Sequence, residues 1–446
     1  MDLSSRLRAI VRSGPQRPRE LTYEPDTGGY ESTLDIGRVA EMLGGRPVKT
    51  AFGQCLAIER RYESDRWHGD IRIGDCELRC GHGLAVLDPG LATPDVRVRG
   101  ADSRVARAVF IDLETTGLSG GAGMVAFLVG LGFFDVGAFQ LRQYLLTSYA
   151  SERALLCAVS ECFDDVDLIV TYNGKTFDVP VMETRWVFHR MELPLGGIPH
   201  FDMLHPARRL WKLRESGAGD LDEGGCRLST LERTLFDVRR VGDVPGLEIP
   251  GRFFQFLRTG DPRPLEPVLE HNRLDLVSLA AVTARAVRLA EEGVDACRDA
   301  GEALALGRVY ERAGALAGAE CCYARGAVSD VVEVRAESLY RLGLRHRRER
   351  RFEQAAVLWR ELLALVEARG CRGSAVLESL RQFAIEALAI HHEHRVRDYV
   401  AAHELMAGAL EEISDAAGRR RENMRHRLAR LERKLSKSAD AGLFPA

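Results

Sequence analysis

Residues 108–117 read AVFIDLETTG, a run of four apolar residues followed by two acids, Asp112 and Glu114. The apolar run predicts a buried strand over 106–113, and the acids leave the end of this strand two residues apart. Because side chains alternate between the two faces of a strand, both carboxylates are expected on one side. Two like charges this close are unfavourable unless a cation lies between them, and divalent ions such as Mg²⁺ prefer oxygen ligands. A solvated acidic turn is the alternative interpretation.

Two later segments carry related chemistry. Residues 170–180 read VTYNGKTFDVP and place Asp178 shortly after a second apolar run. Residues 271–275 read HNRLD and lie in a helix predicted to continue into the 280s, where His271 and Asp275 share one face, one turn apart. The three segments supply four acids and one imidazole. This set predicts two-metal hydrolysis of phosphodiesters, with the two cations roughly 3.5–4 Å apart.

Taken together, the three segments resemble the DEDD exonuclease superfamily, which has a ribonuclease H fold and four catalytic acids. FIDLETTGL (110–118) resembles the first motif of proofreading 3′–5′ exonucleases. TYNGKTFDVPVM (171–182) is similar to the second motif, especially that of family B DNA polymerases, and HNRLDLVSL (271–279) resembles the third. The chain is most similar to the YprB-like group of bacterial ribonuclease H-like proteins, which have C-terminal helical repeats. The resemblance covers about residues 105–290.

The resemblance implies a role for each matched residue. Two Mg²⁺ or Mn²⁺ ions would be held by Asp112, Glu114, Asp178 and Asp275. His271 would position or deprotonate the attacking water, since histidine serves as a general base near neutral pH. In the histidine branch of the superfamily a His precedes the last Asp by five residues, and in the tyrosine branch a Tyr precedes it by four. Here a His takes the four-residue spacing. The alternative for His271 is a helix-surface histidine paired with a nearby carboxylate.

Neighbours of the acids are predicted to bind the nucleic acid. These residues flank the first two motifs: Thr115, Thr116, Gly117, Leu118, Asn173 and Lys175. Leu118 resembles the apolar wedge that members of the superfamily press against a terminal base, and Lys175 is expected to meet a phosphate. An ordinary turn is the alternative for Asn173 and Gly174. Asp202 is a fifth acid, either close to the site or at the N-terminus of a helix.

Three parts are predicted along the 446 residues. Residues 1–100 form an N-terminal region with short strands and no assigned role. Residues 101–293 form an α/β ribonuclease H-like domain, a mixed sheet flanked by helices, and residues 294–446 form an all-α helical-repeat domain. In the last part, two units that begin at Gly307 and Gly343 are offset by 36 residues. They are similar to tetratricopeptide helix pairs, whose usual period is about 34 residues.

The composition limits how the chain meets its partners. The net charge is −3, so a contact with nucleic acid must be local rather than a property of the whole surface. A basic final helix predicted over 402–435 either offers a phosphate-binding face or is a solvated helix with Glu–Arg pairs. No apolar run is long enough for a membrane-spanning helix, and segment 1–20 lacks the apolar core of a signal peptide. We therefore expect a cytoplasmic protein.

The resemblance thus implies a 3′–5′ exonuclease that acts on single-stranded DNA or RNA 3′ ends and releases nucleoside 5′-monophosphates. The alternative is an adaptor that binds nucleic-acid ends and recruits a protein partner through its helical repeats. The choice between DNA and RNA, the physiological substrate, the protein partner and the oligomeric state stay open.

Overall fold

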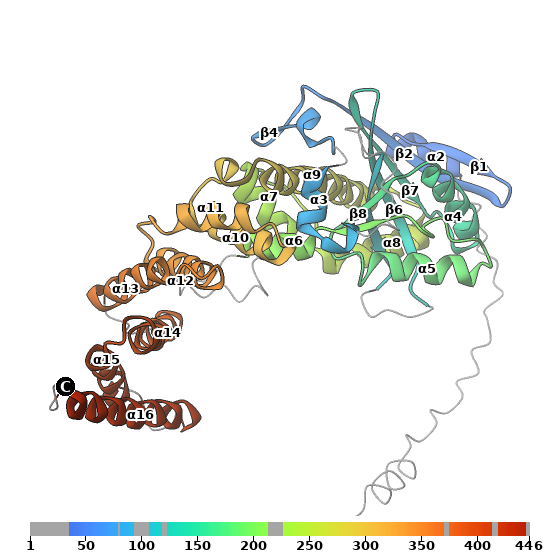
Figure 1. Cartoon of the computed structure of the whole chain (residues 1–446). Helices are drawn as coiled ribbons and strands as arrows, with labels where there is room; N and C mark the ends of the chain where they lie inside the picture. Colours follow the sequence, from blue (N-terminus) through green and yellow to red (C-terminus); the bar gives the residue numbers. More distant parts are fainter. Residues whose placement is uncertain are drawn as a thin grey trace, which may run out of the picture. The chain divides into compact units, whose positions relative to one another are not determined.

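The computed structural model describes residues 35–78, 81–92, 107–117, 123–212, 226–369, 374–412 and 418–442. The fold below is that of the unit that comprises residues 36–446. Figure 1 shows the arrangement of its helices and strands and labels most of them. The predicted fold class is confirmed, because a mixed sheet flanked by helices is followed by an all-helical region. Within the described ranges, none of the helices combines the length and the apolar character needed to cross a membrane.

Seven strands form one mixed sheet in the order β1-β2-β7-β6-β5-β8-β9. Strand β5 (Ala108–Thr115) is antiparallel to β6 (Ala126–Asp135), which is antiparallel to β7 (Ala138–Leu145). On its other side β5 is parallel to β8 (Leu168–Thr171), and β8 is parallel to β9 (His200–Asp202). The sheet is therefore mixed, as the sequence predicts for the ribonuclease H-like domain.

Two strands from the N-terminal region extend the same sheet. Strand β1 (Arg46–Thr50) pairs with β2 (Gly53–Glu63), and β2 pairs with β7. Strands β3 (Trp67–His68) and β4 (Ile71–Arg72) form a separate two-stranded sheet. The sequence predicts short strands here but not their place in the main sheet, since local alternation does not specify a distant partner strand. The three-part division of the chain stays a prediction, and its first boundary separates segments that share one sheet.

Helices cover the sheet and connect its strands. They are α2 (Ile36–Leu43), α3 (His82–Leu87), α4 (Glu152–Ser160), α5 (Asp178–Phe188), α6 (Leu204–Trp211), α7 (Leu228–Phe236), α8 (Ile249–Thr259) and α9 (Glu266–Glu292). Short 3₁₀ turns occur at Ile73–Cys76, Pro89–Ala92, Tyr149–Ser151, Glu161–Phe163, Gly246–Glu248, Arg263–Leu265 and Gly293–Ala296. Helix α9 begins with a proline in its first turn, where the missing N–H would have no partner in any case.

The hydrophobic core lies between α9 and the face of the sheet that carries the first motif. Phe110, Leu141 and Val170 from three strands belong to the same buried cluster as Leu276 and Ala280 of α9. Burying a large apolar side chain of this kind stabilises a fold by about 1.5–3 kcal/mol. The third motif is on α9, so this packing brings it against the strand of the first motif.

Beyond α9 the described chain is helical. The helices are α10 (Ala300–Ala313), α11 (Leu316–Gly326), α12 (Val332–Arg348), α13 (Phe352–Arg369), α14 (Ala375–His391), α15 (Tyr399–Glu412) and α16 (Gly418–Gly442), with a π-helical turn at His392–Val396. Consecutive helices contact one another. A Cβ atom at Gly343 of α12 would lie 2.1 Å from Nε1 of Trp359 on α13, so glycine permits their close packing. The tetratricopeptide-like character of the repeats stays a prediction.

The end of the chain differs from the single helix predicted over 402–435. Helix α15 ends at Glu412 and α16 begins at Gly418, so two helices occupy this segment. Three cations of α16 pair with one acid of the π-helical turn, Glu393, at 2.7–3.0 Å; they are Arg427, Arg430 and Lys434. These cations therefore hold α16 against the π-helical turn, and the two alternatives for this segment stay predictions.

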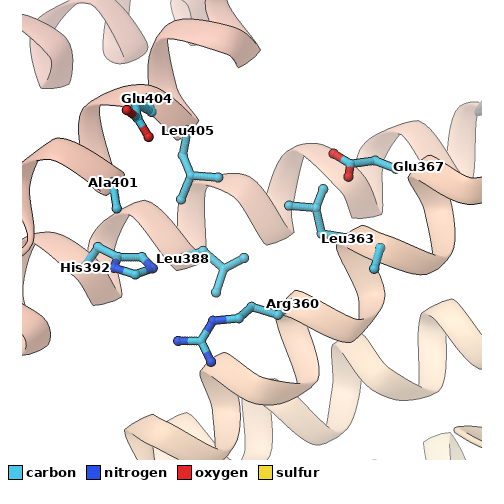
Figure 2. Close-up of a pocket in the computed structure, with 9 residues that line it drawn as sticks. Arg360, Leu363, Glu367, Leu388, His392, Ala401, Glu404 and Leu405 are labelled. Carbon is cyan, nitrogen blue, oxygen red and sulfur yellow. The ribbon is translucent and has the colours of Figure 1, made fainter.

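A cavity of about 520 Å³ lies among the C-terminal helices (Figure 2). Leu363 of α13, Leu388 of α14 and Leu405 of α15 supply apolar walls, while Arg360 and His392 supply polar ones. None of the predicted catalytic or nucleic-acid-binding residues lines this cavity. The candidate active site lies instead at the sheet.

Candidate active site

The first motif is on β5, which lies between β6 and β8 in the sheet. Asp112 is opposite Gly130 of β6, and Glu114 is opposite Leu128. Both acids are partly buried. Their two-residue spacing puts them on the same face of β5, as the sequence predicts.

The second motif joins the first through a backbone contact. Asp178 is the first residue of α5 and is 6% exposed. Its carboxylate accepts hydrogen bonds from its own backbone N–H and from that of Leu113 on β5. The side chain of Asp178 therefore lies directly against the strand that carries Asp112 and Glu114.

The acids of the three motifs act on one another electrostatically. Burial raises the pKa of Asp112 well above its ordinary value, and the charges of Asp275, Glu114 and Asp178 raise it further. Burial and the charges of Asp275 and Asp178 do the same for the pKa of Glu114. Burial raises the pKa of Asp178 to about 7, although its backbone hydrogen bonds oppose the shift. The four acids thus form one cluster, which added positive charge would stabilise.

Two amide side chains hold Asp112 in place. Asn272 of α9 donates from Nδ2 to Oδ2 of Asp112 at 2.7 Å and to its backbone oxygen at 3.1 Å. Gln143 of β7 donates from Nε2 to Oδ1 of Asn272 at 2.8 Å and to the backbone oxygen of Leu269 at 2.8 Å. A Cβ atom at Gly130 would lie 2.2 Å from Oδ1 of Asn272, so this close approach requires glycine. The sequence analysis missed these residues; a glycine inside an apolar strand was the available signal.

Asp275 of the third motif pairs with a buried arginine. Arg240 donates one hydrogen bond to Asp275, and two more reach the carboxylate of Glu232 at 2.6 and 2.9 Å. The side chains of Arg240 and Glu232 are 6% and 1% exposed. Burial alone would lower the pKa of Arg240, but Glu232 and Asp275 raise it above its ordinary value. Arg240 therefore carries its charge, and the sequence analysis missed it because it lies in an irregular loop after α7.

The imidazole of His271 lies between two carboxylates. Its Nδ1 is 2.6 Å from Oδ1 of Asp243, and its Nε2 is 3.5 Å from Oδ2 of Asp275. Burial alone would raise the pKa of Asp243, but His271 and Arg240 lower it. His271 thus has the nearby carboxylates that the alternative interpretation expects, and its catalytic role stays a prediction.

Asp202 holds the turn of the second motif. Its Oδ1 accepts from the backbone N–H groups of Asn173 at 2.8 Å and Leu204 at 3.1 Å, and its Oδ2 accepts from that of Lys175 at 3.0 Å. Asn173 has a φ of +69°, a left-handed conformation that asparagine tolerates. The ammonium group of Lys175 pairs with Asp88 at 3.1 Å. Asp202 therefore supports the motif and also meets the start of α6.

The remaining predicted contacts to nucleic acid lie at the end of β5. Thr115 donates from Oγ1 to the backbone oxygen of Gly117 at 2.7 Å, and Oγ1 of Thr116 accepts from the backbone N–H of Val125 at 3.1 Å. Leu118 lies outside the described residues. The nucleic-acid contacts of this group stay a prediction.

The donor set of the cluster suits a divalent cation. As they stand, no three His, Cys, Asp or Glu side chains in the described part of the chain form a group that could hold a metal ion. Three of the acids nevertheless supply carboxylate oxygens whose negative charges repel one another, namely Asp112, Glu114 and Asp178. The guanidinium of Arg240 donates instead to Asp275, Glu232 and Asp243. Oxygen donors with excess negative charge fit Mg²⁺ or Mn²⁺.

The chain is similar to proteins of known sequence and structure. A model of the RNase_H superfamily matches residues 109–287. A protein of Bacillus subtilis (strain 168), described as "Uncharacterized protein YprB", is 32% identical over 402 residues, which span 89% of this chain and 90% of that protein. The family B DNA polymerase from the hyperthermophilic archaeon Pyrobaculum calidifontis matches 48% of this chain and 30% of the polymerase chain, at 14% identity and a TM-score of 0.32.

The chain therefore contains a domain of the ribonuclease H superfamily. It belongs to the YprB family.

Proposed function

We propose that this protein is a metal-dependent 3′–5′ exonuclease that hydrolyses the phosphodiester bonds of single-stranded DNA or RNA. The observation that supports this proposal is that three separate segments of the chain meet at β5. Asp178 accepts from the backbone N–H of Leu113, and Asn272, three residues before Asp275, donates to Asp112 at 2.7 Å. A fold gains no stability from a cluster of acids unless a cation joins it, so the arrangement favours a functional site. The superfamily of the domain agrees with this chemistry.

Each side chain of the site has a proposed role. Two Mg²⁺ or Mn²⁺ ions are held by the carboxylates of Asp112, Glu114, Asp178 and Asp275. Such ions, when bound, activate water and stabilise the attacking and leaving oxygens of the displacement. His271 accepts a proton from the attacking water through Nε2, while Asp243 orients the ring through Nδ1.

The nucleic acid is proposed to bind beside the acids. The backbone and hydroxyl groups of Thr115, Thr116 and Gly117 contact the terminal nucleotide. Asn173 contacts the strand near the scissile phosphate, and Lys175 releases Asp88 to meet a phosphate. A lysine that exchanges one anionic partner for another loses little stabilising free energy, because a partly exposed ion pair stabilises the fold by less than about 1 kcal/mol.

The test is a cleavage assay on 3′-labelled single-stranded DNA and RNA, with Mn²⁺, with Mg²⁺ and with a chelator. We expect release of mononucleotides from the 3′ end, no cleavage of circular single strands, and no activity with the chelator. Asp112→Asn is expected to abolish cleavage. Asp135→Asn, which changes an exposed acid of the β6–β7 hairpin, is the matched control and should cleave at the parent rate. Cleavage by folded Asp112→Asn at the parent rate would reject the proposal.

A second candidate function is an adaptor that binds nucleic-acid ends and recruits a protein through the helical region. The cavity between α13, α14 and α15 favours it, because apolar walls beside an arginine and a histidine can receive a peptide side chain (Figure 2). Capture of a partner by the full chain, lost in Arg360→Glu and retained in Asp275→Asn, would support this role. The two functions are compatible.

A further inference from the structure

Three residues form a row across neighbouring strands of the sheet. Gln143 of β7 pairs with Gly130 of β6, and Gly130 pairs with Asp112 of β5. Side chains in such a row point to the same face of a sheet. The middle position has no side chain, and Asn272 of α9 occupies the space above it. Asn272 thereby joins Gln143 to Asp112, two strands away.

Backbone carbonyl groups fix which way the side-chain amides of Gln143 and Asn272 are oriented. The backbone oxygen of Leu269 only accepts hydrogen bonds, so the NH₂ group of Gln143 must face it. The backbone oxygen of Asp112 also only accepts, so the NH₂ group of Asn272 must face β5. Turning either amide over would set an acceptor oxygen against an acceptor oxygen. Asn272 therefore presents a donor to the Asp112 carboxylate.

Burial makes this arrangement sensitive to change. Asn272 is 0% exposed and Gln143 is 1% exposed, so water does not readily replace a lost hydrogen bond. A buried donor or acceptor left without a partner loses its full solvation energy. Gln143 donates to Asn272 and Leu269 through its amide, and Asn272 in turn donates to Asp112.

We propose that Gln143 and Asn272 form an amide relay that fixes the Asp112 carboxylate for cation binding. Gln143 is a positioning residue in this relay and acts on Asp112 through Asn272. The inference rests on the proposed function in one respect, namely that Asp112 is a metal ligand. Partners that orient metal ligands in this way are commonly worth 10–100-fold in metal affinity.

The experiment measures Mn²⁺ affinity by electron paramagnetic resonance on the full chain. The variants are Gln143→Met, Asn272→Ala and the double variant. We expect Gln143→Met to weaken Mn²⁺ binding about tenfold and Asn272→Ala to weaken it by about 10–100-fold. The double variant should match Asn272→Ala alone, because Gln143 has no effect once Asn272 is removed. A general loss of packing would not show this dependence of one substitution on the other.

Leu141→Met is the matched control. Leu141 is fully buried on the same strand as Gln143 and pairs with Gly132 rather than Gly130, so it lies outside the relay. Its Mn²⁺ affinity should equal that of the parent. Thermal unfolding in chelator verifies that each variant is folded, and Gln143→Leu replaces Gln143→Met if the latter does not fold.

The outcomes separate the relay from the proposed function. If Gln143→Met weakens Mn²⁺ binding by the same factor with and without Asn272, or leaves it unchanged when Asn272 is present, the relay is rejected. If the parent binds Mn²⁺ with the expected pattern of variants but cleaves neither DNA nor RNA, the exonuclease proposal is rejected and the relay stands. A parent that binds no Mn²⁺ rejects both.

Discussion

Arg240 donates a hydrogen bond to Asp275, so one of the four clustered acids has its own counter-charge. The same guanidinium is held at 2.6 and 2.9 Å by Glu232, which also accepts from the hydroxyl of Ser278. His68 in turn contacts Ser278 at 2.9 Å. This chain of contacts is buried, and in a buried ion pair the loss of one partner leaves a charge without compensation.

Arg240→Met is therefore expected to lower the free energy of unfolding by about 3–5 kcal/mol, because Glu232 stays buried without its partner. Chemical denaturation of the chelated protein measures this change. Arg239→Met is the control, since the Arg239 side chain is 78% exposed and its loss should change stability by less than about 0.5 kcal/mol. A loss below about 1 kcal/mol for Arg240→Met would show that the pair behaves like a surface ion pair.

The raised pKa of Asp178 predicts an unusual dependence of stability on pH. Burial raises this pKa from 3.8 to about 7, so between these values the folded state binds a proton that the unfolded state has released. The contribution of Asp178 to stability without metal must then fall as the pH rises from about 4 to about 7. Asp178→Asn removes this ionisation, and its melting temperature in chelator should exceed that of the parent more at pH 8 than at pH 4.

Differential scanning fluorimetry at the two pH values measures the effect of Asp178→Asn. Asp135→Asn, at an exposed position, should track the parent at both. Saturating Mn²⁺ should raise the melting temperature of the parent at pH 8 and have a smaller effect on Asp178→Asn, because a ligand that binds the folded state stabilises it. Equal pH dependence in the parent and in Asp178→Asn would contradict the assigned pKa.

Local sequence patterns predicted much of the fold and the acidic part of the site. The alternation around Asp112 and Glu114 and the apolar run before Asp178 depend on a few neighbouring residues, so period and spacing were sufficient. Gln143 lies within the predicted ribonuclease H-like domain. Its contact with Asn272 was not predicted, because the two residues are 129 positions apart and meet only when α9 packs on the sheet.

The other site residues that the sequence did not predict lie in the irregular loop after α7. Arg240 and Asp243 follow no period and match no motif, and their partners Glu232 and His271 lie on two different helices. An arginine near an acid is common in a chain with 28% charged residues, so sequence alone could not distinguish this buried pair from a surface one. The pairing of β2 with β7 was also not predicted, because the two strands are far apart in the sequence.

Asp202 is expected to affect both stability and cleavage, although it belongs to none of the three motifs. Asp202→Asn keeps the shape but replaces one acceptor oxygen with a donor, so at least one of the backbone N–H groups of Asn173 and Lys175 loses its partner. We expect a loss of about 1–3 kcal/mol in unfolding free energy and slower cleavage, because the turn before Asp178 is loosened. Asp164→Asn, at an exposed position, should change neither. Unchanged stability in Asp202→Asn would remove Asp202 from this supporting role.

His271 and Asp243 make a paired prediction for catalysis. If His271 is the general base, His271→Gln should slow cleavage by about 10²-fold or more. Asp243→Asn should slow it less, by about tenfold, because it alters the partner that orients the ring. Single-turnover cleavage rates under saturating Mn²⁺ measure both, with His205→Gln on α6 as an exposed histidine control. His271→Gln that cleaves at the parent rate would assign His271 to a purely structural ion pair.

Glu393 is expected to hold the last helix in place. Its side chain is 0% exposed and pairs with Arg427, Arg430 and Lys434 of α16. Burial alone would raise its pKa, but the hydrogen bonds from Arg430 and Lys434 lower the pKa of Glu393 from 4.5 to about 2. The stability from these contacts is therefore present above about pH 4.5 and is lost as the pH falls toward 2.

Glu393→Gln should release α16, because three cations then share a neutral acceptor and a buried cluster loses its central charge. Hydrogen exchange followed by mass spectrometry should show faster exchange across residues 418–442 at pH 7, with little change in the sheet. Glu432→Gln, whose side chain is 64% exposed, is the control and should exchange like the parent. Equal exchange of α16 in the parent and in Glu393→Gln would mean that apolar contacts such as those of Met424 and Leu431 suffice to hold the helix.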